Sequence, residues 1–204
     1  MSNRRWLTIA CALIAVILSQ SANALTTEDR ECAEQQVYAT YLNESLTRTF
    51  DRRLVVLSPM TEAIDGPMNA LGGKLDKALA YSLPEASPQV IADFLAANEI
   101  SVPHQRSRYC LLTQASYQAP SEHTLAAIFQ PDSRVSGWDR FHNTFPHTVG
   151  LVRFSKVGFD DELGQALVYV RISCDAGCNS AYYVLMHRGY DGWYFTRLER
   201  APSE

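Results

Sequence analysis

The side chains best suited to chemistry are the histidines, and two of them lie close together in the sequence. His142 and His147 are five positions apart, with Asp139 nearby, and an acidic residue directly precedes His123. Two ligands on one helix face need a spacing of three or four, as in the zinc motif H-E-x-x-H, and Pro146 ends a helix between these two. We therefore predict no metal site and no cofactor. A hydrolase site that joins one of these histidines to an acidic partner stays open as an alternative function.

Aromatic side chains crowd the last third of the chain. Most such residues pack a core, but a sheet with aromatics on both faces can also expose one face for binding. We name four candidate binding residues: Trp138, His142, Tyr183 and Trp193. The sequence contains no G-x-S-x-G elbow, phosphate-binding glycine loop or reactive-cysteine signature, so no catalytic motif accompanies them.

The N-terminus has the pattern of a cleavable signal peptide. Arg4 and Arg5 precede an apolar run from Ile9 to Leu18, and the small-x-small sequence Ala22-Asn-Ala24 follows. The apolar run is about half the ~20 residues that a membrane-spanning helix needs. We predict that residues 1–24 are a signal peptide cleaved after Ala24, that no transmembrane anchor remains, and that the protein is periplasmic or secreted.

Removal of this segment changes the charge and the cysteine count. The whole chain has a net charge of −4, and loss of two arginines leaves 16 basic and 22 acidic residues, a net of about −6. No basic cluster is visible, which argues against a nucleic-acid partner.

Four cysteines remain once Cys11 leaves with the signal peptide. An even number in an oxidising compartment favours disulfides over zinc. Of the three pairings, we favour Cys174 with Cys178, because a three-residue turn brings them close together. Cys32 with Cys110 then follows by elimination.

The elements that must position these residues are helices followed by strands. Apolar spacing predicts a helix from Glu28 to about Phe50, Ser87-Pro88 supplies the start of another that runs to Asn98, and aromatic spacing predicts a short helix that ends before Pro146. Strands are expected at 54–57 and 109–113, then at 148–159, 165–174, 181–188 and 193–198. We predict one α+β domain over residues 25–204, with an antiparallel four-stranded C-terminal meander and the N-terminal helices packed on one face.

Several of these segments follow a familiar pattern: Asp93-Phe94-Leu95 with Asn98, Val157-Gly158-Phe159, Ala166 to Val170, Tyr182-Tyr183 and Gly192-Trp193. In this pattern the chain resembles an uncharacterised family of exported bacterial proteins. The resemblance implies the same fold, and it implies no activity, because none is established for that family.

The sequence therefore favours a non-catalytic binding or interaction domain, exported and stabilised by disulfides. Its expected partner is a protein or a component of the cell envelope. The envelope hydrolase with a His/carboxylate site is the alternative.

Overall fold

The computed structural model describes residues 26–46, 54–64, 74–104, 116–131, 135–175 and 177–201. The predicted signal peptide, the strand expected at 109–113 and Cys110 lie outside these residues. The helices are α2 (Thr27–Tyr41), which continues as the π-helical turn η1 (Leu42–Leu46), α4 (Leu75–Ser82), α5 (Pro88–Ala97), α6 (Glu122–Ile128) and α7 (Gly137–Thr144). The strands are β1 (Leu54–Leu57), β2 (Tyr117–Gln118), β3 (Thr148–Phe154), β4 (Gly158–Phe159), β5 (Gln165–Asp175), β6 (Cys178–Gly189) and β7 (Gly192–Arg200).

In the described part of the chain, the strands form one mixed sheet with the order β2-β1-β3-β5-β6-β7, and β4 pairs with β5. β1 is parallel to both β2 and β3. From β3 through β5 and β6 to β7, neighbouring strands are antiparallel. This arrangement confirms the α+β class and the antiparallel C-terminal meander.

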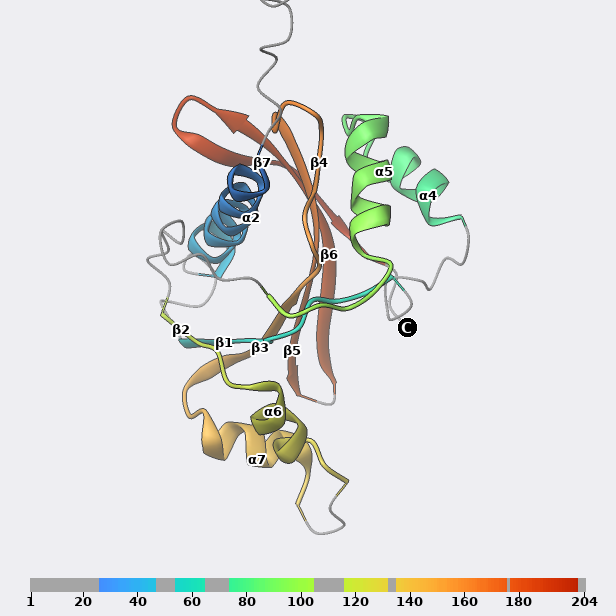
Figure 1. Cartoon of the computed structure of the whole chain (residues 1–204). Coiled ribbons are helices and arrows are strands. Elements are labelled where there is room, and N and C mark those ends of the chain that lie inside the picture. Colours follow the sequence, from blue (N-terminus) through green and yellow to red (C-terminus); the bar gives the residue numbers. More distant parts are fainter. Residues whose placement is uncertain are drawn as a thin grey trace, which may run out of the picture.

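The helices differ from the prediction in one respect, because they cover both faces of the sheet. Figure 1 shows α2 on one side of the long strands and α4 with α5 on the other. Along β5, Val168 and Val170 pack in the same core cluster as α2, whereas Leu167 and Tyr169 pack with α4 and α5. Each face of this strand is apolar, so each face requires its own cover of helices.

Local signals explain where the two main helices begin. Thr26 and Asp29 form a capping box at the start of α2: the Asp29 N–H donates to Thr26 Oγ1, and the Thr26 N–H donates to Asp29 Oδ2, both at 3.1 Å. Ser87 caps α5 in the same way by accepting from the Val90 N–H, and Pro88 occupies the first turn as predicted.

A close approach of backbones holds α5 on the sheet. A Cβ added at Gly158 in β4 would lie 2.5 Å from the Phe94 Cα in α5, so only glycine allows this contact. Asn98 follows the helix and is fully buried; its side chain donates to the Lys156 carbonyl and accepts from the Lys156 N–H. The end of α5 is thereby fixed to the connection between β3 and β4.

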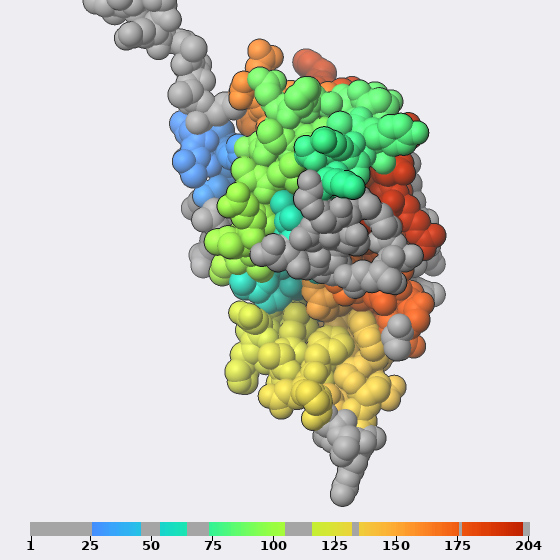
Figure 2. Space-filling model, turned by 90° about the vertical axis from the view of Figure 1, so that its right-hand side faces the viewer, coloured from blue at the N-terminus to red at the C-terminus, as the bar shows by residue number. Residues whose placement is uncertain are grey.

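The helices α6 and α7 form a separate layer at the lower end of the sheet (Figure 1), and Figure 2 shows them below the face that α4 and α5 cover. Their aromatic side chains pack with Val56 and Leu151 of the sheet in a third core cluster. Among the residues that the structure describes, no helix has the length and apolar character required to cross a membrane.

Candidate functional site

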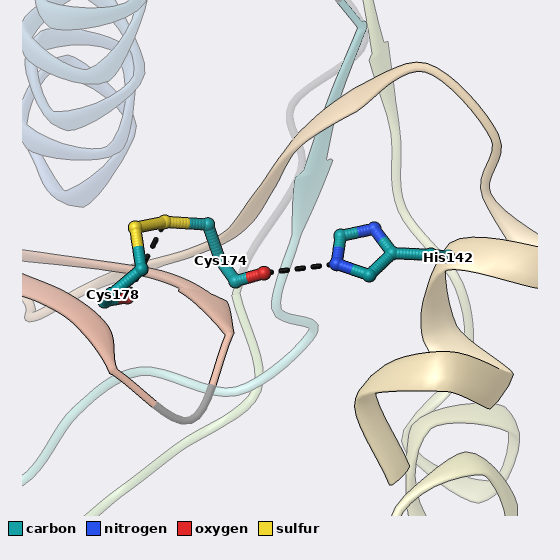
Figure 3. Close-up of a disulfide and its surroundings, with 3 residues drawn as sticks. All are labelled: His142, Cys174 and Cys178. Atoms are coloured by element: carbon teal, nitrogen blue, oxygen red, sulfur yellow. Dashed lines mark hydrogen bonds between the residues drawn. A yellow bond between two sulfur atoms is a disulfide. The ribbon is translucent and has the colours of Figure 1, made fainter. Parts of the chain in front are cut away.

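Two of the four predicted binding residues, Trp138 and His142, lie together on α7. Trp138 is half-buried, and its ring centroid lies 5.2 Å from that of Phe129 and 5.3 Å from that of Phe141. His142 is exposed, and its Nε2 lies 2.9 Å from the Cys174 carbonyl oxygen (Figure 3). His142 therefore joins α7 to the end of β5, whereas Trp138 packs between α6 and α7.

The other two predicted residues lie on opposite faces of the sheet. Tyr183 is 4 % exposed and packs with α4 and α5, and burial raises the pKa of its hydroxyl well above the ordinary value. Trp193 is 6 % exposed and packs in the cluster that contains α2. The structure therefore does not combine the four residues into one surface.

The short disulfide closes the turn between β5 and β6. Cys174 and Cys178 are bonded, with their Cα atoms 5.2 Å apart (Figure 3). Cys32 lies on α2, and Cys110 lies outside the described residues, so the pairing of these two stays a prediction.

The histidines considered for a hydrolase lie apart from one another. His123 is exposed on α6, and His147 is exposed just after α7 with a φ of 62°. Among the described residues, none of His123, His142 and His147 contacts a carboxylate. The described residues also contain no group of His, Cys, Asp and Glu side chains that is suited to hold a metal ion. The geometry thus offers no support for a His/carboxylate pair.

Two cavities flank α2, at the end of the molecule opposite α6 and α7. The first, which we call the helix pocket, has a volume of about 490 Å³ and is lined by Thr26, Thr27, Arg30, Gln89, Ala92, Asp93, Phe159, Asp160, Asp161 and Leu163. The second, which we call the hairpin pocket, has a volume of about 380 Å³ and is lined by Gln36, Ala39, Thr40, Asn43 and residues 188–193. Both volumes fall in the range of about 300–1,000 Å³ that is usual for small-ligand sites.

Asp93 organises the helix pocket. Its Oδ2 accepts hydrogen bonds from Arg30 on α2 and, at 2.7 Å, from the Phe159 N–H on β4. Nearby, Asp160 Oδ1 accepts the N–H groups of Gly164 at 2.6 Å and Gln165 at 3.1 Å. The Asp93 carboxylate therefore already binds β4, and the Asp160 carboxylate already binds the loop between β4 and β5.

Two neighbouring aromatic rings line the two pockets, one ring in each. Phe159 lines the helix pocket, Trp193 lines the hairpin pocket, and their ring centroids are 5.8 Å apart. An arginine lies over each ring: Arg30 is 5.3 Å from the Phe159 centroid, and Arg188 is 6.0 Å from that of Trp193. Such cation–π contacts hold each guanidinium at the edge of a pocket.

Buried polar contacts fix α2, which supplies a wall to both pockets. Glu34 is almost fully buried, its Oε2 lies 2.6 Å from the Lys156 Nζ, and the Tyr38 hydroxyl lies 2.7 Å from its Oε1. At the helix start, hydrogen bonds from Thr26 hold the pKa of Asp29 below its ordinary value, and the charge of Arg188 acts in the same direction. The helix is thus tied to the sheet along its length.

Of the residues that line these two pockets, only Trp193 was among the binding residues predicted from the sequence. Arg30 and Asp93 are 63 positions apart, and neither belongs to a recognisable motif. Phe159 is one of many aromatic residues near the C-terminus, and no spacing distinguishes it. Only the fold brings these residues together.

The described residues form an α+β fold with two cavities beside α2, each of a volume usual for small-ligand sites. No family model, no curated protein and no solved structure matches the chain. The resemblance to an exported bacterial family therefore stays a prediction.

Proposed function

We propose that the chain is an exported, non-catalytic binding domain, stabilised by disulfides, that holds a ligand from the cell envelope. Residues 1–24 are its signal peptide, and the mature protein acts in the periplasm or after secretion. The ligand lies where α2, β4 and the hairpin of β6 and β7 meet. The observation that carries this proposal is the neighbouring pair of rings, Phe159 and Trp193, each of which gives one polar pocket an apolar side.

The polar lining of the pockets supports binding over an apolar docking function. Around these two rings, the cavities offer carboxylate, guanidinium, amide and hydroxyl groups. A site with rigid apolar rings and a few placed polar groups is typical of small-ligand recognition. Catalysis would require an acid–base pair in a cleft, and none of the histidines named for that role supplies one.

Retention of envelope material on the immobilised mature protein tests the proposal. The variant Ala92→Trp would fill the helix pocket, and the variant Thr40→Trp would fill the hairpin pocket. We expect at least one of these variants to lose the glycan, peptide or lipid component that the unmodified protein retains. Ala96→Trp is the matched control, because Ala96 is exposed one turn from Ala92 on α5 and does not line the pocket.

Two results would contradict the proposal. The first is equal retention by all variants, which would place binding elsewhere on the molecule. The second is release of cleaved fragments from the envelope polymers, which would show that the protein is a hydrolase.

A further inference from the structure

Two arginines lie directly opposite each other on neighbouring antiparallel strands. Arg153 on β3 is in register with Arg171 on β5, and both side chains lie on the face of the sheet that carries Tyr169. Like charges in such a pair destabilise a sheet, because the two Cβ atoms are only about 4.5–5.5 Å apart. These two residues, which we call the arginine pair, therefore require negative charge close by.

One carboxylate faces both guanidinium groups. Glu62 Oε1 lies 3.6 Å from Arg153 Nε and 3.9 Å from Arg171 Nη1. Both contacts are longer than a hydrogen bond, and neither arginine donates a hydrogen bond to any residue that the structure describes. Two positive charges and one negative charge leave this group with a net charge of +1.

The guanidinium groups are partly buried but open to solvent. The side chains of Arg153 and Arg171 are 29 % and 26 % exposed. Among the described residues, the buried polar atoms without a partner include no guanidinium nitrogen, so the unpaired nitrogens of this pair have accessible surface. Burial lowers the pKa of Arg153, the charge of Glu62 opposes this, and the charge of Arg171 reinforces it. The pair thus presents unused donors and excess positive charge to a solute.

The arginine pair lies between two helix layers on the same face of the sheet. Two positions before Arg171, Tyr169 packs with α4 and α5, and two positions before Arg153, Leu151 packs with α6 and α7. Neither arginine lines the helix pocket or the hairpin pocket. The pair is therefore separate from the two pockets of the proposed function.

A carboxylate group has the charge and the shape that suit this pair. Guanidinium groups donate parallel hydrogen bonds to the two oxygens of a planar carboxylate. One carboxylate carries a charge of −1 and neutralises the pair together with Glu62, whereas a phosphate monoester carries about −1.5 to −2 at pH 7. An uncharged ligand would leave the excess charge in place.

We infer that Arg153 and Arg171 together bind the carboxylate group of a small ligand. This inference goes beyond the proposed function and does not depend on it, because it concerns a different part of the molecule. A peptide with a free C-terminus and an acidic sugar both present such a group.

Nuclear magnetic resonance titration of the isotope-labelled protein, followed at the arginine Nε–H signals, tests the inference. The probes are acetate, N-acetyl-alanyl-alanine and glucuronate at constant ionic strength, with glucose as the neutral control. We expect saturable shifts of the Arg153 and Arg171 signals with at least one carboxylate and none with glucose. Preference for the peptide or for the sugar acid identifies the source of the group. No saturable shift with any carboxylate, or tighter binding of inorganic phosphate, would overturn the inference.

Variants separate ligand binding from a purely structural role. Arg171→Gln removes one guanidinium and should weaken carboxylate binding about tenfold or more. Glu62→Gln removes the competing carboxylate and should strengthen binding by about two- to fivefold, whereas a structural role alone gives weaker or unchanged binding. If Arg171→Gln does not fold, Glu62→Gln decides between the two roles.

Arg197→Gln is the matched control. Arg197 on β7 also lies near one glutamate, 3.8 Å from Glu199, but it is opposite Leu185 rather than a second arginine. This variant should leave the affinity for the carboxylate unchanged. Equal affinities of Arg171→Gln and Arg197→Gln, or no gain in Glu62→Gln, would also overturn the inference.

Discussion

At the scale of single residues, Asp93 joins three of the elements that form the helix pocket. One carboxylate oxygen on α5 accepts from Arg30 on α2 and from the Phe159 N–H on β4. Asp93→Ala leaves this N–H without its acceptor, which costs about 1–3 kcal/mol of the free energy of unfolding. Urea denaturation followed by circular dichroism measures the change.

Asp161→Ala is the control for this prediction. Asp161 accepts a hydrogen bond from Gln89 at an exposed position, 2.9 Å away. We expect its loss to change the free energy of unfolding by less than about 0.5 kcal/mol. If both variants lose the same free energy of unfolding, the structural role of Asp93 is contradicted.

Buried tyrosines predict a loss of stability in alkali. Burial raises the pKa of Tyr38 and of Tyr41 well above the ordinary value of 10. In the unfolded chain these hydroxyls ionise near pH 10, whereas in the folded chain they stay protonated. Their contribution is therefore complete below about pH 10 and decreases as the pH rises, by up to about 1.4 kcal/mol per pH unit for each tyrosine.

Tyr41→Phe tests this linkage. The variant lacks one ionising group, so its free energy of unfolding should fall less steeply between pH 10 and pH 11 than that of the unmodified protein. The two slopes should differ by at most about 1.4 kcal/mol per pH unit, which corresponds to one proton. Urea midpoints at a series of pH values give the slopes. Tyr190→Phe is the control, since that side chain is fully exposed. A slope that Tyr41→Phe does not change would refute the assignment.

At the scale of secondary structure elements, the contact between α5 and β4 depends on Gly158. An alanine Cβ would lie 2.5 Å from the Phe94 Cα, and both backbones would have to separate. We expect Gly158→Ala to lower the free energy of unfolding by about 1–3 kcal/mol, the usual cost of overpacking. Thermal or urea denaturation measures it.

Gly177→Ala provides the comparison, because no atom lies within 4 Å of the Cβ it would add. This variant should match the unmodified protein closely. A tolerated alanine at Gly158 would mean that α5 does not pack on β4 as described.

The elements differ in how well the sequence predicts them. The start of α5 could be predicted from Ser87-Pro88, because capping and the φ of proline are local effects. The seven-residue helix α6 was not predicted, since it is too short for a clear apolar period. The parallel pairing of β1 with β3 depends on contacts about 94 positions apart in the sequence, which no local pattern reports.

The sequence likewise did not predict that helices cover both faces of the sheet. Leu167 and Tyr169 on β5 are as buried as Val168 and Val170. Arg171 and Ser173 follow on the same side of the strand as Tyr169, so the alternation alone predicts that this face is mixed rather than apolar. This face of the strand is buried because α4 and α5 cover it. The sequence did not predict that these helices lie on the face opposite α2.

At the scale of the whole molecule, the proposed framework of two disulfides requires the proposed export. Intact-mass and peptide-mass spectrometry of unreduced protein from the periplasm tests both together. We expect a chain that begins at Leu25, with Cys174 linked to Cys178 and Cys32 linked to Cys110. A full-length chain with free thiols would show that the protein is not exported.

The predicted Cys32–Cys110 disulfide should contribute more to stability than the Cys174–Cys178 disulfide. A bridge that closes a loop of this length contributes roughly 4–5 kcal/mol in the chain-entropy model, against about 2 kcal/mol for the short one. Serine substitution of Cys32 should therefore lower the free energy of unfolding more than substitution of Cys174 and Cys178 together. The same denaturation experiment measures both.

We propose that the end of the molecule around Phe159 and Trp193 binds an envelope ligand. Chemical-shift mapping of the isotope-labelled mature chain with glycan, peptide and lipid fractions of the envelope tests it most directly. We expect saturable shifts on α2, on β4 and at the turn of the β6–β7 hairpin. Shifts confined to α6 and α7, or no shifts with any fraction, would contradict it.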